Sequence, residues 1–282
     1  MIMKNNQLTE WAKQHPIKAG FLITIIFVVL RKGLHLLFMA LPQTIGFRVV
    51  HEILDVLWPY LMVVAFNQTE ALRKRGFFRT LFFGLPFLIL SIFLFVANIS
   101  NLSQTPEIEW YPLPMILLGI FTGFAVGFRE ESVFRGIQVN IMTDKYLKDR
   151  KGIFRIVAIS SFFFGIMHMS NMIIGASFVS CLGQSIYAFG VGTLFAAMYL
   201  RGDSLWALIF IHGLYDTALS AATLFTATYG GDMLSSLAQN QEETLMSILT
   251  TNLFSPIYLA IALFLLRKSK CEEIIKKYES RQ

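Results

Sequence analysis

Long apolar runs separated by short polar segments set the pattern of the whole chain. Each run approaches the ~20 residues that a helix needs to cross the hydrocarbon core of a bilayer. Eight such runs lie near residues 19–41, 45–66, 77–97, 112–131, 154–175, 178–200, 203–225 and 248–266. The pattern predicts an all-α, polytopic membrane protein that forms a bundle of about eight transmembrane helices.

The composition agrees with this fold class and leaves almost no chain for a soluble module. Charged residues make up 15% of the chain, whereas a soluble domain has about a quarter. We therefore expect residues 1–282 to form a single integral membrane domain. Cys181 and Cys271 are the only cysteines, which argues against a disulfide framework or a thiolate metal site. The apolar stretch 21–30 is followed by no clear small-residue cleavage site, so a removed signal peptide is not expected.

The basic residues indicate membrane topology rather than nucleic-acid binding, although the net charge is +6. Most of them lie in the two terminal tails, in the loop after the second run and in residues 129–155. Residues 98–111, 170–177 and 226–247 contain no Lys or Arg. The positive-inside rule then predicts that both termini, and the end of the fourth run, are cytoplasmic. An even number of spans is needed for this alternation, and eight satisfies it.

Three polar side chains, Arg31, Lys32 and His35, interrupt the first run. We expect this span to be shortened, to be kinked, or to line a water-filled cavity. After the fourth run, residues 132–150 are expected to continue the same helix into the cytoplasm.

A polar stripe begins the second run. Arg48, Glu52 and Asp55 follow an i, i+4, i+7 spacing, with His51 beside them. We interpret this stripe as ion pairs near a helix end rather than as a second chemical site.

Four ionisable residues lie in the segment from Arg129 to Arg135, at the end of the fourth run. Ionisable residues at membrane depth are costly and suggest a functional site. Glu131 and Arg135 are i, i+4 with the acid first, which favours a helical ion pair. Glu130 points about 100° away on the same helix and is left without that partner. The simpler alternative is a charge cluster at a helix end.

Two of the five histidines lie inside apolar runs, at His168 and His212. Phe164 precedes His168 by one helical turn, and Asp216 follows His212 by one turn. A lone buried histidine is usually a packing residue. Polar groups at membrane depth, however, must face one another or water. We therefore expect these side chains and the Glu130–Glu131–Arg135 cluster, from three different spans, to converge.

These motifs resemble those of a known family. Glu130-Glu131-x-x-x-Arg135, then Phe164-x-x-x-His168, then His212-x-x-x-Asp216 is similar to the ordered pattern of CPBP intramembrane proteases. That family includes CAAX-prenyl proteases and bacteriocin-processing (Abi) proteins. The resemblance implies a protease-like core at about residues 110–225.

The resemblance also implies residue roles. Glu130 would be the general base for water, assisted by His168, and His212 with Asp216 would stabilise the oxyanion. Glu131, Arg135 and Phe164 would support the site. An ionised Asp cannot donate to an oxyanion, so Asp216 would have to be protonated, orient His212 or bind a metal.

Zinc is a possible cofactor, because Glu130, His168, His212 and Asp216 together are a candidate ligand set. Their spacing differs from the His-Glu-x-x-His motif of zincins. We slightly favour a metal-free glutamate mechanism.

The function expected from this resemblance is intramembrane cleavage of a membrane-associated peptide or protein, with lipid and substrate as partners. The main alternative is a non-proteolytic membrane regulator or immunity protein on the same fold. A transporter is a third option, but it would need a polar pathway on both sides. The substrate stays open between a prenylated CAAX protein, a bacteriocin or pheromone leader and a membrane-protein tail.

The topology is testable with reporter fusions. Because the Lys and Arg pattern predicts two cytoplasmic termini, fusions at residues 105 and 240 should report as external. Fusions at residues 145 and 278 should report as internal. A cytoplasmic reading at residue 240 would end the eight-span topology.

Overall fold

The computed structural model describes residues 7–41, 44–102, 108–226, 248–249 and 252–280. The fusion sites 105 and 240 therefore lie outside the described residues. Within these ranges the chain is helical, and its only extended pairing is an isolated bridge between Trp110 and Thr226. The all-α membrane class is confirmed.

The helices follow the apolar runs in chain order. They are α1 (Gln7–Gln14), α2 (Pro16–Met39), α3 (Ile45–Ala65), α4 (Phe77–Phe83), α5 (Leu85–Leu102), α6 (Leu113–Glu131), α7 (Asn140–Tyr146), α8 (Arg150–Ile166), α9 (Phe178–Gly202), α10 (Leu205–Leu219), α11 (Ala221–Phe225), α14 (Ser255–Leu265) and α15 (Lys268–Glu279). Short helical segments of other types are η1 (Thr69–Leu72), η2 (Ser132–Val139) and η3 (Met167–Ile174).

Each of the eight apolar runs contains a helix, but only some of these helices are long and apolar enough to span a membrane. Four helical segments of the described chain are long and apolar enough, namely Pro16–Met39, Leu113–Tyr146, Arg150–Ile174 and Phe178–Gly202. The pair α4–α5, bent by 68°, would be a fifth. Helix α3 has the length but carries three charged residues, and α10 and α14 are shorter. By length and composition alone, four or five segments of the described residues qualify as spans, compared with the eight apolar runs of the sequence.

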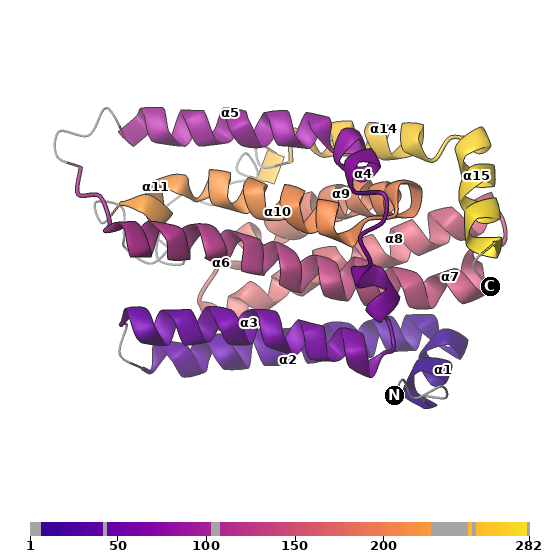
Figure 1. Cartoon of the computed structure of the whole chain (residues 1–282), viewed down its shortest axis with the longest axis horizontal. Coiled ribbons are helices and arrows are strands. Elements are labelled where there is room, and N and C mark those ends of the chain that lie inside the picture. Colours follow the sequence, from indigo (N-terminus) through magenta and orange to yellow (C-terminus); the bar gives the residue numbers. More distant parts are fainter. Residues whose placement is uncertain (1–6, 42–43, 103–107, 227–247, 250–251, 281–282) are drawn as a thin grey trace.

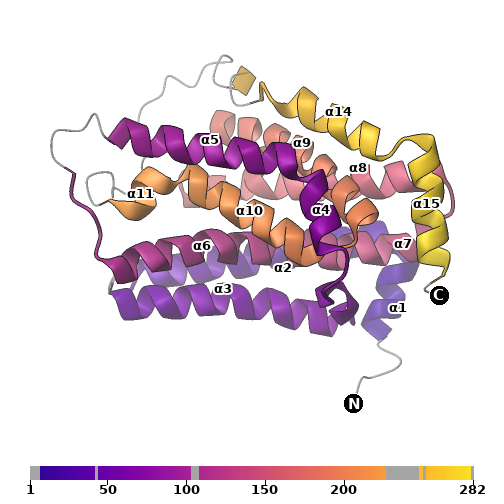
Figure 2. The same ribbon diagram turned by 45° about the horizontal axis from the view of Figure 1, so that its top comes forward.

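Helix α6 is central in the bundle (Figures 1 and 2). It packs against α10 on one side and against α3 on the other, while α8 packs on α9, and α9 on α14. Helices α1, α7 and α15 lie at one end of the bundle (Figure 1). Large apolar side chains such as Phe78 and Phe93 are exposed on the outside, as expected for a surface that contacts lipid.

Small residues allow α6 and α10 to approach closely. Gly119, Gly123 and Gly127 repeat every four residues along α6. A Cβ atom at Gly127 would lie 2.8 Å from the carbonyl oxygen of Ile209 and 2.9 Å from the backbone nitrogen of Gly213. Stripes of small residues are a common way for membrane helices to pack backbone against backbone. This packing brings the end of α6 against the middle of α10.

The helix that begins with α6 continues to Tyr146, as expected, but its first part after Glu131 is buried in the bundle rather than exposed. All eight residues of η2 are buried in the bundle. The segment is a π-helix, a widened turn that is often found at functional sites. Only the following helix, α7, reaches the end of the bundle, where Asp144 forms a 2.8 Å ion pair with Lys13 of α1.

The first run is neither shortened nor broken, because α2 is continuous over 24 residues. Lys32 is buried, and Arg31 turns its guanidinium into the bundle, towards Glu130 of α6.

The contact between α6 and α10 predicts the effect of a single methyl group. In Gly127→Ala the new Cβ meets backbone atoms that cannot rotate away, so we expect destabilisation by about 1–3 kcal/mol. Thermal unfolding of the purified protein in detergent would measure it as a lower midpoint. Gly33→Ala is the matched control, since a Cβ there meets nothing within 4 Å and alanine favours a helix by roughly 0.5–1 kcal/mol. Equal midpoints for both variants would contradict the tight packing.

Candidate active site

The innermost element of the site is the ion pair between Glu131 and Arg135. Arg135 Nη1 donates to Glu131 Oε1 at 3.0 Å, and both side chains are almost completely buried. The i, i+4 ion pair predicted from the spacing is confirmed. Arg135 also donates to the carbonyl oxygen of Gly192 in α9 at 3.3 Å, and its guanidinium lies 4.3 Å from the ring centre of Phe164 in α8. One arginine therefore connects three helices.

Glu131 also fixes His212 of α10. His212 Nδ1 lies 2.8 Å from Glu131 Oε1. Because the carboxylate already accepts a hydrogen bond from Arg135, it acts as an acceptor here, and His212 Nδ1 is the donor. The opposite ring nitrogen, Nε2, then faces Asp216 Oδ2 at 3.5 Å and Glu130 Oε2 at 3.8 Å. Glu131 thus sets the direction of the imidazole ring.

Glu130 is buried, and each of its two oxygens faces a nitrogen from another helix. Oε1 lies 4.0 Å from Arg31 Nη1 of α2, and Oε2 lies 3.8 Å from His212 Nε2. Neither distance is that of a hydrogen bond. The expectation that Arg135 holds one carboxylate while the other is left open for chemistry agrees with this geometry, but Glu130 has a cationic neighbour that the motifs do not include.

His168 lies in η3, just after the end of α8, where its ring is held by its own helix. Its Nδ1 is 2.9 Å from the carbonyl oxygen of Phe164. A carbonyl only accepts, so Nδ1 carries the proton, and a neutral His168 has a lone pair at Nε2. The ring of Phe164 packs edge-on against His168 and also against His212, with centroid distances of 5.3 and 6.2 Å. Phe164 therefore spaces the two histidines.

A second buried ion pair lies beside the site, between Arg129 of α6 and Asp55 of α3. Asp55 also accepts from Trp58 Nε1 at 3.4 Å. The polar stripe in α3 thus forms ion pairs. The partner of Asp55, however, is Arg129 of α6 rather than Arg48 of the same helix. No ion pair joins Arg48 to Glu52 or Asp55 within the described ranges, and Arg48 is exposed.

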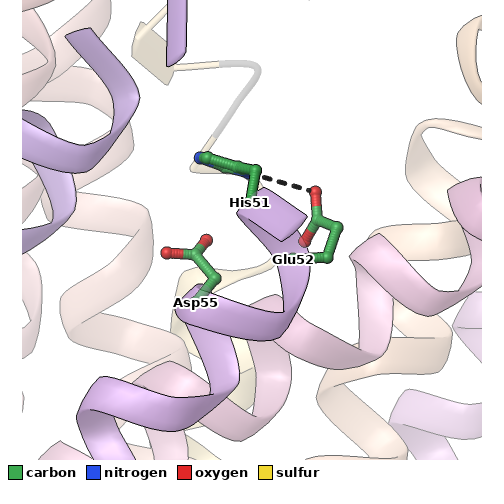
Figure 3. A group of neighbouring side chains, drawn as sticks. All are labelled: His51, Glu52 and Asp55. Atoms are coloured by element: carbon green, nitrogen blue, oxygen red, sulfur yellow. Dashed lines mark ion pairs between the residues drawn. The ribbon is translucent and has the colours of Figure 1, made fainter. Parts of the chain in front are cut away.

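His51, Glu52 and Asp55 form the one group of His, Cys, Asp or Glu in the described residues whose possible ligand atoms lie within 4.8 Å of one another (Figure 3). His51 Nδ1 is 3.5 Å from Glu52 Oε1. Asp55, however, is committed to Arg129 and Trp58. This commitment favours a structural role for the group.

Lys32 anchors the segment that carries His168. Lys32 Nζ donates to Asn171 Oδ1 at 2.6 Å, and Asn171 Nδ2 donates to Gln184 Oε1 at 2.7 Å. These two hydrogen bonds tie η3 to α2 and α9. The polar residues that interrupt the first apolar run therefore belong to the surroundings of the site, and their position within an apolar run is the signal that could have indicated it.

The zinc alternative requires Glu130, His168, His212 and Asp216 to present their ligand atoms together. Zinc ligands lie about 2.0–2.2 Å from the metal, so their donor atoms must be close neighbours. No three of these four residues bring their ligand atoms within 4.8 Å of one another in the described chain. Arg31 also points its positive charge at Glu130. The arrangement does not fit a preformed zinc site.

Comparison with known proteins finds a similarity over the part of the chain that carries the motifs. Residues 111–218 match the family model described as type II CAAX prenyl endopeptidase, Rce1-like. The match confirms the predicted resemblance to CPBP proteases and spans α6 to α10, which carry all the motif residues. It supports, at family level, a CAAX-type endopeptidase in the membrane. No curated protein and no solved structure matches the chain.

Proposed function

We propose that the chain is an intramembrane endopeptidase in which Glu130 activates water to cleave a membrane-associated peptide or protein. The observation that carries this proposal is the environment of Glu130. Its carboxylate is buried, lacks a direct hydrogen bond to its nearest neighbours, and faces His212 with Arg31 on its other oxygen. A buried carboxylate in this setting suits a base that takes a proton only when a substrate arrives.

In the proposed reaction, Glu130 takes a proton from water while the water oxygen bonds to the carbonyl carbon of the scissile peptide. The electron pair of the C=O bond moves to the carbonyl oxygen and forms the oxyanion. Glu130 then returns the proton to the amide nitrogen as the C–N bond breaks. His168, with Nδ1 occupied by Phe164, offers its Nε2 lone pair to orient the water.

His212 has the role of oxyanion donor in this scheme. Since Nδ1 donates to Glu131, Nε2 can donate only from an imidazolium. The three carboxylates of Glu130, Glu131 and Asp216 around the ring favour that cation. Asp216 then orients and neutralises His212 and need not contact the oxyanion itself.

The membrane orientation that accompanies this proposal has both termini in the cytoplasm. The location of α1, α7 and α15 at one end of the bundle supports it (Figure 1). The substrate would reach Glu130 from within the bilayer or from its cytoplasmic face.

The first test separates catalysis from stability. Glu130→Gln keeps the shape of the side chain and removes the base, so cleavage of a farnesylated CAAX peptide should be lost while the protein yield and unfolding midpoint are kept. Arg135→Ala removes one of the two partners of the buried Glu131 carboxylate and leaves only His212, which should cost up to about 3–5 kcal/mol and lower both yield and activity. Full activity in Glu130→Gln would remove the proposed base. A folded wild-type protein that cleaves no peptide would favour the non-proteolytic regulator.

The second test concerns Asp216 and metal dependence. Asp216→Asn keeps the side-chain shape and its ability to orient His212, so much of the peptidase activity should remain in the metal-free mechanism. In a zinc site the same change would remove an anionic ligand and sharply lower metal affinity. The purified protein should be assayed as Asp216→Asn and, separately, as wild type with a strong chelator. Loss of activity with chelator, and recovery with added zinc, would contradict the glutamate mechanism.

A further inference from the structure

Arg31 lies on α2, outside the matched residues 111–218 and outside all three sequence motifs, yet it reaches the centre of the site. Its Nη1 is 4.0 Å from Glu130 Oε1. The same Nη1 atom is buried and donates no hydrogen bond within the described structure. A buried guanidinium nitrogen without an acceptor is costly, which suggests that its acceptor arrives with the substrate.

We propose that Arg31 is a further catalytic residue, which donates from Nη1 to the carbonyl oxygen of the scissile peptide as that oxygen becomes the oxyanion. This inference rests on the proposed peptidase function and adds a residue to it. It also gives a function to a charged residue that lies within an apolar helix.

The position of the two donors around Glu130 supports this role. Arg31 and His212 face opposite oxygens of the Glu130 carboxylate, at 4.0 and 3.8 Å. A water activated by Glu130 lies within hydrogen-bond distance of that carboxylate, and the carbonyl group that it attacks lies about 3–3.5 Å further on. The carbonyl oxygen then falls in the region that these two nitrogens flank. At 4.0 Å the Arg31 nitrogen is not consumed by a hydrogen bond to Glu130.

The number of hydrogen-bond donors available to the oxyanion also points to Arg31. His212 offers one N–H group, at Nε2, because Nδ1 is held by Glu131. Asp216 donates nothing when ionised. An oxyanion hole commonly uses more than one donor, and among the other arginines near the site, Arg135 is held by Glu131 and Arg129 by Asp55. Arg31 has no such direct partner.

The movement of charge during the reaction also favours Arg31. In the resting site the negative charge is on Glu130. After proton transfer Glu130 is neutral, and the negative charge is on the former carbonyl oxygen. The Arg31 guanidinium lies beside both positions, so a negative charge stays next to it throughout the reaction. The site then needs no rearrangement as the charge moves, which is the condition for strong electrostatic stabilisation of the transition state in a dry site.

The experiment compares Arg31→Gln and Arg31→Lys with the wild type, and with Arg48→Gln as a control at an exposed arginine. Cleavage of a farnesylated CAAX peptide gives kcat and KM. Inhibition by the matching peptide phosphonate, a tetrahedral anion that resembles the oxyanion intermediate, gives a second measurement. Binding of the uncleaved peptide is measured with each Arg31 change added to Glu130→Gln.

For Arg31→Gln we expect kcat to fall roughly 100- to 1,000-fold and phosphonate affinity to fall in parallel, while uncleaved peptide binds as before. Arg31→Lys keeps the charge on a side chain without the planar fork of arginine, so its kcat should lie between those of Arg31→Gln and wild type. Arg48→Gln should behave as wild type.

Three results would overturn the role of Arg31 while leaving the peptidase proposal intact. They are wild-type kcat in Arg31→Gln, a loss confined to KM, and unchanged phosphonate affinity. If Arg31→Gln does not fold, Arg31→Lys decides by the same measurements, and an unchanged kcat there overturns the role. A wild-type protein that cleaves no peptide would instead refute the peptidase function and this inference with it.

Discussion

The buried carboxylate of Glu131 is the interaction on which the rest of the site depends. It is completely buried and is shared between Arg135 and His212. An unpaired charge at this depth would cost several kcal/mol, so the three side chains have to stay together. Arg135 in turn donates to the carbonyl oxygen of Gly192 and packs on the ring of Phe164. One carboxylate therefore fixes the relative positions of α6, η2, α8, α9 and α10.

Close packing of backbones makes this arrangement possible. Gly123, Gly127 and Gly213 let α6 approach α10 so closely that an added Cβ at any of them would meet an atom of the other helix within 3.0 Å. A wider separation would move His212 away from both glutamates, because helices that carry larger residues pack at greater axial distance. The small residues thus set the distance between α6 and α10, and the contacts of the charged residues require that distance.

The site divides its charges between structure and chemistry. The pairs Glu131–Arg135 and Asp55–Arg129 are direct ion pairs that are buried on both sides. Glu130 and Arg31 face each other at 4.0 Å without a hydrogen bond. Charges in direct ion pairs hold helices together, whereas a pair that faces each other without a hydrogen bond is ready to interact with a substrate. This contrast is the physical basis for assigning the two glutamates of one motif different roles.

By itself, the sequence determined the features that depend on local spacing and composition. Apolar runs specified the helical membrane class, and i, i+4 spacing placed Arg135 beside Glu131 and Asp216 beside His212, as the structure has them. Spacing could not reveal the partners of Arg31, Lys32 and Asp55, because contacts between helices depend on how far each helix is rotated and how deep it lies. It also could not show that the residues after Glu131 form a buried π-helix, since their polarity resembles that of a cytoplasmic segment. Only the tertiary structure decided these points, because packing around a buried charge selects one rotation and one depth for every helix that touches it.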